Sequence, residues 1–322
     1  MLAALFTPYV DGVLVVAFAY ACVTIGLQIT LASGQFSVAH AALMGLGGYA
    51  GGIATKAWDW PFIAALAFGL LIGGLFGLAF AVVLQRTSGV LLGTVTIAAG
   101  QALSIIMRNT TEVFGVKTGG SQGLTGIPTL TTLTWAAGGA AFALLAALVL
   151  RRSRAGMGML ALGKDETVAR SLGIWQLGTR IWGFGMGGAL AGLGGVLLAC
   201  NNGVVQPAQL SFASEPLFFI FLMVGGLTTP WGALVGAVGV WWLQELLRYP
   251  WSSDGHFLFL EQNDRYWILG ALLVIVVLFR PYGLIVRRPL RLPKANEPRT
   301  PQPLPASSGT PDPRFGTSVP GG

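Results

Sequence analysis

The sequence predicts an all-α protein that crosses a membrane several times. Of its 322 residues, 54% are hydrophobic and only 10% are charged, whereas soluble domains carry about a quarter charged residues. Several apolar runs are long enough to cross roughly 30 Å of hydrocarbon as helices. The 47 glycines suit helices that pack closely in a membrane. The apolar runs are continuous rather than alternating, which argues against a porin-like barrel.

The first half of the chain divides into five apolar segments. They are Gly12–Leu31, Phe36–Thr55, Pro61–Leu84, Gly89–Met107 and Trp135–Leu150. Pro61 suits a helix start, because the N–H that proline lacks has no partner in the first turn. Gly69, Gly73 and Gly77 recur every four residues, which places small residues on one helix face. A long polar loop rich in Gly and Thr, 108–133, follows the fourth segment.

The second half adds four segments. They are Trp182–Cys200, Pro216–Thr228, Gly232–Leu247 and Tyr266–Phe279. The two middle ones are short enough to be broken or re-entrant helices, which are tolerated where the backbone faces protein or a water-filled cavity. We therefore expect about nine membrane segments, within a range of roughly eight to ten. Residues 1–288 form the membrane domain on this interpretation.

The most polar internal stretch is the loop 151–181. It contains the basic residues Arg151, Arg152, Arg154, Lys164, Arg170 and Arg180, and the acidic residues Asp165 and Glu166. Cytoplasmic loops carry an excess of Lys and Arg, so we place this loop and the basic stretch 280–299 inside. Counting back through the segments places the loop 108–133 and the N-terminus outside.

This topology makes the two halves of the chain candidates for inverted repeats. The first segment would run inward and the sixth outward, which is a common plan in transporters. Gln35-Phe36-Ser37 precedes Leu43-Met44 and Gly47-Gly48, much as Gln209-Leu210-Ser211 precedes Leu222-Met223 and Gly225-Gly226. The spacings differ, so two unrelated halves remain an open alternative.

Charge and cysteine content exclude several other classes. The net charge of +7 is concentrated in 151–180 and 280–299, where the positive-inside rule explains it without nucleic acid. Cys22 and Cys200 lie in apolar runs, which is typical of core packing and makes neither a disulfide framework nor a metal site. The stretch 289–322 is rich in Pro, Ser, Gly and Thr, so we expect a disordered cytoplasmic tail.

The chain shows no sign of its own energy source or of enzyme chemistry. Gly115-Val116-Lys117-Thr118 lacks the glycine spacing of an ATP-binding phosphate loop. Ion-coupled carriers usually hold ionisable groups within their membrane segments, and here His40 and Glu245 are the main candidates. We interpret His40 as a hydrogen-bonded packing residue and Glu245 as interfacial. The sequence thus predicts a passive pathway that another subunit drives.

Four stretches resemble the LivM-type permease family of branched-chain amino-acid ABC importers. They are SGQFSVAHAALMGLGGYA (33–50), TGGSQGLTGIP (118–128), RAGMGMLALGKDETVARSLGI (154–174) with GGALAGLGGVLLA (187–199), and LFRPYGLI (278–285). Their order and spacing agree with the family over roughly residues 10–285. The family's Gly-Arg at the start of the polar loop is replaced by Arg154-Ala155-Gly156-Met157.

The resemblance implies a subunit of the bacterial inner membrane with several partners. These would be a second permease, related or identical, two ATP-binding subunits and a periplasmic solute-binding protein. The chain itself would need no cofactor, because the partner subunits bind ATP. The outer loop Thr118–Pro128 would either face the binding protein or use its glycines for tight turns, and we favour the turns.

The resemblance also identifies the polar loop as the element that couples the permease to the ATPase. The residues it implicates are Gly156, Lys164, Asp165, Glu166, Ala169, Leu172 and Gly173. We expect a short helix from Glu166 to Gly173, on which Ala169 and Gly173 share one small face that docks into an ATPase groove. The alternative is a solvated loop without a partner.

Polar side chains near helix breaks are candidates for the translocation pathway. They are Gln35, Ser37, His40, Thr94, Thr96 and Gln101 in the first half, and Gln206, Gln209 and Ser211 in the second. A zwitterionic amino acid would suit exposed half-helix ends and polar amides. Each of these residues could instead cap a helix or join two helices.

Several functional alternatives remain open at this level. The same family includes importers of urea and short amides, and no residue here separates those substrates. A stand-alone channel could use the same glycine-rich helices. An ion-coupled carrier would need buried carboxylates, which the predicted segments lack.

Overall fold

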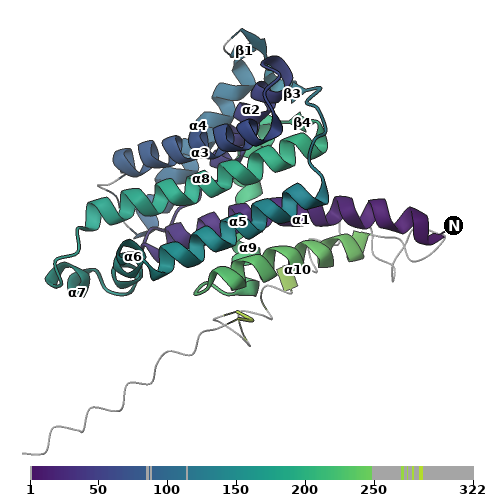
Figure 1. The fold of residues 1–322 in the computed structure, drawn as a ribbon. Helices are drawn as coiled ribbons and strands as arrows, with labels where there is room; N and C mark the ends of the chain where they lie inside the picture. Colours follow the sequence, from purple (N-terminus) through teal and green to yellow (C-terminus); the bar gives the residue numbers. More distant parts are fainter. Residues whose placement is uncertain are drawn as a thin grey trace, which may run out of the picture. The chain divides into compact units, whose positions relative to one another are not determined.

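The structure, a computed structural model, describes residues 2–84, 87, 89–113, 115–248, 270, 271, 274, 278 and 283–285. The predicted tail 289–322 and most of the predicted segment Tyr266–Phe279 lie outside these residues, so both remain predictions. Within the described residues the chain is mostly helical, as expected for the predicted class (Figure 1).

Six long helices carry most of the described chain. They are α1 (Leu2–Ala32), α2 (His40–Ala57), α3 (Phe62–Leu84), α4 (Gly89–Asn109), α5 (Leu133–Arg152) and α8 (Gln176–Asn202). The remaining helices are α6 (Arg154–Lys164), α7 (Glu166–Ser171), α9 (Glu215–Gly225) and α10 (Pro230–Arg248). Most of these bounds agree with the predicted segments to within a few residues.

Five helices of the described chain are long and apolar enough to cross a membrane. They comprise α3, α5 and α8 together with Tyr9–Ala32 of α1 and Leu91–Asn109 of α4. A sixth span results if Phe212–Gly225 and Pro230–Leu246, which meet at a bend of 116°, count as one. The class of protein that the sequence predicts is therefore confirmed, whereas the number of about nine segments stays a prediction.

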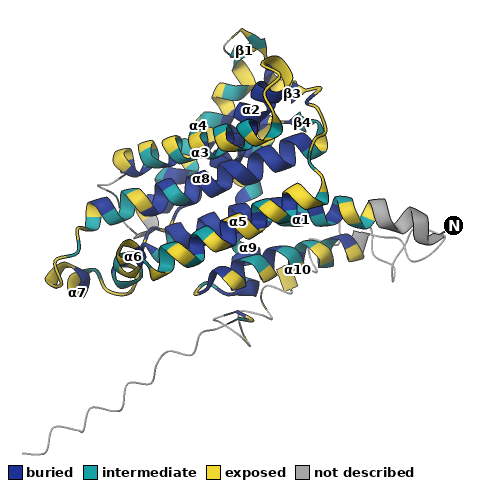
Figure 2. Cartoon of the chain, viewed as in Figure 1, coloured by how far each residue is buried: buried dark blue, intermediate teal, exposed yellow. Residues whose placement is uncertain are grey.

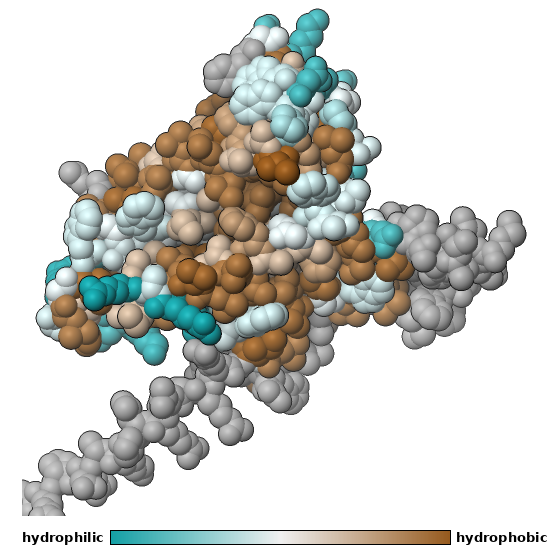
Figure 3. Space-filling view, in the orientation of Figure 1, coloured by the Kyte–Doolittle hydropathy of each residue, from teal (hydrophilic) through white to brown (hydrophobic). Residues whose placement is uncertain are grey.

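The two ends of the helical body differ in what they carry. Two antiparallel strand pairs, β1 (Glu112–Val113) with β2 (Val116–Lys117) and β3 (Leu124–Thr125) with β4 (Val204–Val205), lie at one end. We call this the strand end, and the opposite end, which carries α6 and α7, the loop end (Figure 1). Figure 3 shows hydrophilic residues at both ends and apolar residues over the helices between them.

Aromatic and glycine residues shape the strand end. Trp58, Trp60 and Phe68 form a cluster with ring centroids 5.2–5.8 Å apart, which is typical of a membrane–water interface. Gly119, Gly120, Gly123 and Gly126 all have positive φ. The expected use of these glycines for tight turns is confirmed, because side chains rarely adopt this conformation. The short strands here were not predicted.

Helix α8 lies at the centre of the bundle and is buried along most of its length (Figure 2). It packs against α1, α2 and α3 through glycines that leave no room for side chains. A Cβ at Gly192 would overlap the carbonyl oxygen of Gly69, and a Cβ at Gly47 would overlap Gly192. The predicted stripe on α3 is confirmed, since Gly69, Gly73 and Gly77 all face α8. Such contacts suit membrane helices, which associate through close van der Waals packing.

Two segments interrupt the helices inside the bundle. The first break, residues 33–39, lies between α1 and α2, and the second, residues 203–214, lies between α8 and α9. Helix α2 therefore begins at His40 and not at Phe36 as predicted. Two features explain this start: Gly34 has a φ of 78°, and the N–H of Val38 donates to the Thr96 hydroxyl of α4, 3.0 Å away, rather than to a helical carbonyl.

We predict that Gly192→Ala destabilises the bundle by about 1–3 kcal/mol, because a methyl group would push α3 away from α8. The loss would be measured as a lower apparent Tm of the purified chain in detergent. Gly138→Ala is the matched control, since a Cβ at Gly138 of α5 meets nothing within 4 Å. Equal melting of both variants would contradict the packing argument.

Candidate functional site

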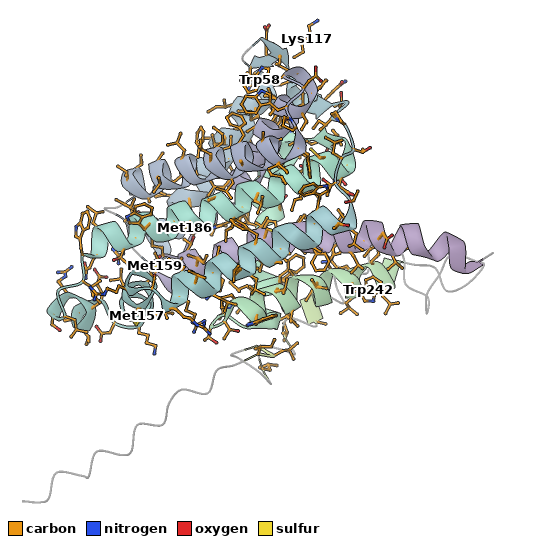
Figure 4. The ribbon with its side chains drawn as sticks, viewed as in Figure 1. Trp58, Lys117, Met157, Met159, Met186 and Trp242 are labelled. Atoms are coloured by element: carbon orange, nitrogen blue, oxygen red, sulfur yellow. The ribbon has the colours of Figure 1, made fainter. Side chains whose placement is uncertain are left out.

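Helix α6 at the loop end is fixed against the core of the bundle. Ser153 caps it by accepting a hydrogen bond from the N–H of Gly156, 3.1 Å away. A Cβ at Gly156 would overlap the carbonyl oxygen of Leu150, and one at Gly163 would overlap that of Ala32. The predicted loop residue Gly156 is thus a packing residue, while Lys164 is exposed. Figure 4 labels Met157 and Met159 of this helix, far from Lys117 at the strand end.

Helix α6 also reaches the first break directly. A Cβ at Gly34 would stand 3.3 Å from the Cα atom of Gly163, so the two backbones are in van der Waals contact. On the other side of the break, a Cβ at Gly183 of α8 would lie 2.7 Å from the Ser33 hydroxyl oxygen. Helix α6 therefore lies directly against the start of residues 33–39.

Helix α7 is capped at both ends. The Asp165 carboxylate accepts hydrogen bonds from the N–H groups of Thr167 and Val168, at 2.8 and 3.0 Å, as an N-cap residue does. At the other end, the N–H of Gly173 donates to Arg170 and that of Ile174 to Ala169. This pair of bonds is the Schellman motif, with Gly173 in the left-handed conformation that the motif requires.

One ion pair and one hydrogen bond attach α7 to α8. Glu166 pairs with Arg180 at 3.0 Å and with Arg170 at 3.4 Å. The side-chain amide of Gln176 donates to the carbonyl oxygen of Glu166 at 3.1 Å. Arg180 is largely buried, with 16% of its side chain exposed, so its pair with Glu166 is less screened by solvent than the pair with Arg170. Asp165 and Glu166, both predicted loop residues, therefore hold the loop in shape.

The prediction that Ala169 and Gly173 share one exposed docking face on a helix is wrong. Helix α7 ends at Ser171, so Gly173 is not on the helix, and the Ala169 side chain is completely buried. Among the apolar side chains that the loop exposes, three lie on α7 or shortly after it: Val168 (53%), Leu172 (70%) and Trp175 (72%). We call these three residues the loop patch. The prediction included Leu172 but missed Val168 and Trp175.

The first break gathers four of the predicted pathway residues: Gln35, Ser37, His40 and Thr96. All four are buried. The Nε2 atom of His40 lies 3.1 Å from the Thr30 hydroxyl, and its ring stacks on Phe184. The expectation that His40 is a hydrogen-bonded packing residue agrees with these contacts. The Ser37 hydroxyl has no hydrogen-bond partner within the described part of the chain.

Glu215 is the residue that the sequence analysis missed. Its side chain is 1% exposed and accepts a hydrogen bond from the N–H of Ala41, 2.6 Å away. The expectation that the apolar segments lack buried carboxylates is therefore wrong. The available signal was an acidic residue immediately before Pro216 at the start of an apolar run, a position that favours carboxylates because a helix begins there.

Glu245 is also a buried carboxylate, but it lies at the far end of α10. It is 9% exposed and accepts a hydrogen bond from the Tyr9 hydroxyl. Tyr9 is the first residue of the span in α1. The expected place of Glu245 near a segment end is thus confirmed.

The other predicted pathway residues are spread over the surface and the second break. Gln209 lines a cavity of about 480 Å³ together with Gln244 of α10 and Ser214. Ser211 is half-buried and donates to the carbonyl oxygen of Ala208, whereas Gln206 is exposed. Thr94 and Gln101 are exposed and seven residues apart, so they lie on one face of α4.

The half-helix ends are not open to a solute in this structure. The N-terminus of α2 is buried, and the Glu215 carboxylate already accepts the N–H of Ala41, the second residue of the helix. The expectation of exposed half-helix ends is therefore wrong for α2. A solute at this level of the bundle would meet the Gln209 cavity rather than the N-terminus of α2.

Comparisons with known proteins identify relatives of the whole helical region. Residues 9–277 match the family model described as "Branched-chain amino acid transport system / permease component". The high-affinity branched-chain amino acid permease LivM of Salmonella typhimurium is 25% identical over 302 residues, covering 83% of this chain and 67% of the relative. LivM of Escherichia coli K12 is 24% identical over the same shares.

More distant relatives match parts of the chain. BraD, a branched-chain amino acid permease of Pseudomonas aeruginosa, is 31% identical over 140 residues, covering 44% of this chain and 42% of the relative. LsrC, an autoinducer 2 import permease of Escherichia coli, is 31% identical over 176 residues, covering 51% and 48%. No solved structure gives a match of comparable significance.

We predict that Asp165→Ala opens α7 locally, because two N–H groups lose their acceptor. An N-cap of this kind contributes about 1 kcal/mol, so the amides of Thr167 and Val168 should exchange with deuterium about fivefold faster. Asp165→Asn is the control, since its carbonyl oxygen can still accept. Unchanged exchange in the alanine variant would show that the cap does not hold α7.

Proposed function

Because the chain belongs to the branched-chain amino acid transport system permease family, we propose that it is the membrane-spanning subunit of an ATP-driven importer for branched-chain amino acids. The proposal is supported by the multi-pass helical body and by relatives named as permeases of such systems. Its partners would be a second permease, two ATP-binding subunits and a solute-binding protein. The ATP-binding subunits supply the energy, and this chain supplies the path.

We place the loop end in the cytoplasm of a bacterial inner membrane. The excess of Arg and Lys in the loop 151–181 supports this orientation. The strand end, with its aromatic cluster, then faces the periplasm and the binding protein. Helix α1 runs inward on this orientation, which keeps the N-terminus outside.

An inverted repeat is supported by the way the two halves are built. In both, a long α-helix is followed by a break in the α-helical structure and then by an α-helix that begins inside the bundle: α1, residues 33–39 and α2, against α8, residues 203–214 and α9. Helices α1 and α8 run antiparallel, since Gly26 approaches Gly187 while Cys22 approaches Gly194. The Gln-x-Ser sequences at 35–37 and 209–211 lie in corresponding breaks. The total of about nine segments is part of the same proposal.

The loop patch is the surface we assign to the ATPase. It presents apolar side chains, Val168, Leu172 and Trp175, on a charged loop that is rigid because α7 is capped at both ends. Exposed apolar residues with a polar rim mark protein contacts. This rigid apolar patch is the observation that carries the coupling role. Lys164, beside it, is exposed and suits the rim.

The pathway is assigned to polar residues that lie away from the glycine-packed core. They are Gln209 and Gln244 in the cavity, and Thr94 and Gln101 on the exposed face of α4. Exposed polar groups on an apolar helix suit a water-filled space shared with a second permease.

The partners are tested by isolating the tagged chain from its native membrane in mild detergent. Recovery of two ATP-binding subunits and a second permease supports the importer. A chain that comes out alone at low salt favours a channel or an ion-coupled carrier. Uptake of leucine, urea and autoinducer 2 by the isolated complex then separates the substrates named for the family and its relatives.

We predict that Leu172→Glu releases the ATP-binding subunits, because it places a charge in the apolar patch. Loss of one anchor of an interface typically costs about 2 kcal/mol, or roughly thirtyfold in affinity. The measurement is the amount of ATPase that copurifies. Leu172→Met, which keeps an apolar side chain of similar volume, is the control. If the glutamate variant copurifies with as much ATPase as the parent, Leu172 does not contribute to the interface.

A further inference from the structure

Glu215 is a fully buried acid that forms no ion pair within the described residues. Its Oε1 atom accepts the N–H of Ala41 at 2.6 Å, and neither of the ion pairs in the described residues involves it. A buried carboxylate is costly unless its surroundings compensate the charge. The compensation must therefore come from the backbone around it.

The N-terminus of α2 supplies the contact that the structure shows. Helix α2 begins at His40 and α9 begins at Glu215 itself, and the bond from Ala41 to Glu215 places the two starts side by side. The first N–H groups of a helix have no partner within it, and the helix start carries a partial positive charge. The Oε1 atom of Glu215 thus lies at the positive end of α2, while its Oε2 atom has no hydrogen-bond partner within the described residues.

The same carboxylate connects the two breaks of the chain. Residues 33–39 lead into α2, and residues 203–214 lead into α9. Helix α4 holds each break separately: Thr96 accepts the N–H of Val38 at 3.0 Å, and Ser104 donates to Pro207 at 2.8 Å. Leu210 of the second break fills the space above Gly45 of α2. Glu215 adds a side-chain hydrogen bond from α9 to the start of α2.

We propose that Glu215 is a positioning residue that latches α2 to α9, so that the two breaks move as one unit. This inference rests on the proposed function, because the movement is that of a transport cycle. The contact between Gly163 of α6 and Gly34 gives the loop end a direct route to the first break. Through the latch, a push on residues 33–39 also reaches the second break and the cavity beside Gln209.

The latch is tested in the full chain within its complex by cysteine labelling. Ser37, completely buried in the first break, is replaced by cysteine and exposed to a membrane-permeant maleimide. Glu215→Leu should raise labelling at position 37 about tenfold, because the N–H of Ala41 loses its acceptor. Glu215→Gln keeps a carbonyl oxygen for this bond and should stay within about threefold of the parent.

Two controls separate the latch from general damage. Cys22 and Cys200 are completely buried in α1 and α8, so they are labelled only if the bundle unfolds. Glu112→Gln, in the exposed β1 strand, removes an acid far from the breaks and should change nothing. Labelling at position 37 that rises in Glu215→Leu while Cys22 and Cys200 stay unlabelled supports the latch.

The outcomes for the latch and for the proposed function are distinct. Unchanged labelling at position 37 in Glu215→Leu overturns the latch, and so does labelling that rises equally at Cys22. Leucine uptake by the same preparations gives the second readout. We expect Glu215→Leu to lower the leucine moved per ATP about tenfold and Glu215→Gln to restore most of it. If the parent complex moves no leucine but shows the expected labelling pattern, the proposed substrate is wrong and the latch is still supported.

Discussion

The close approach of α8 to its neighbours is the constraint on which the rest of the structure depends. At Gly192 and Gly195 the backbone of α8 touches that of α3 and α2, with no side chain between them. In a bilayer, helices gain little from the hydrophobic effect, so such contacts supply the packing that holds them together. They also fix the axial position of each helix, because every glycine must stand opposite its partner.

The two breaks need polar partners because the bundle around them is apolar. A backbone N–H without an acceptor is costly at this depth. At the first break the chain meets this need with Thr96, which accepts from Val38, and with Glu215, which accepts from Ala41. At the second break Ser104 donates to the carbonyl oxygen of Pro207. All three polar partners come from helices that are distant in sequence from the residues they contact. Each break is therefore stable only in the assembled bundle.

The sequence predicted most helices but not how the breaks are built. Length and hydropathy located both ends of α3 and α5 to within a few residues, since these signals are local. They missed the starts of α1 and α8, which begin at Leu2 and Gln176 rather than at Gly12 and Trp182. The late start of α2 depends on Thr96, and the burial of Glu215 depends on Ala41; both contacts form across long stretches of chain. At the loop, helical spacing suggested that Ala169 and Gly173 share a face. The Schellman motif ends α7 before Gly173, and spacing alone does not reveal where a short helix stops.

The positions of the capped helix α7 and of the break at residues 33–39 indicate how a movement of the loop end would affect the rest of the bundle. Helix α7 is capped at both ends and paired with α8 through Glu166 and Arg180, so it transmits force rather than bending. The glycine-packed helices behind it have no free volume in which to slide. The first break is different, because Gly34 and the residues up to Ala39 lie outside any helix. Movement that enters through Gly163 is therefore absorbed at this break, and the bond from Ala41 to Glu215 decides whether α9 follows.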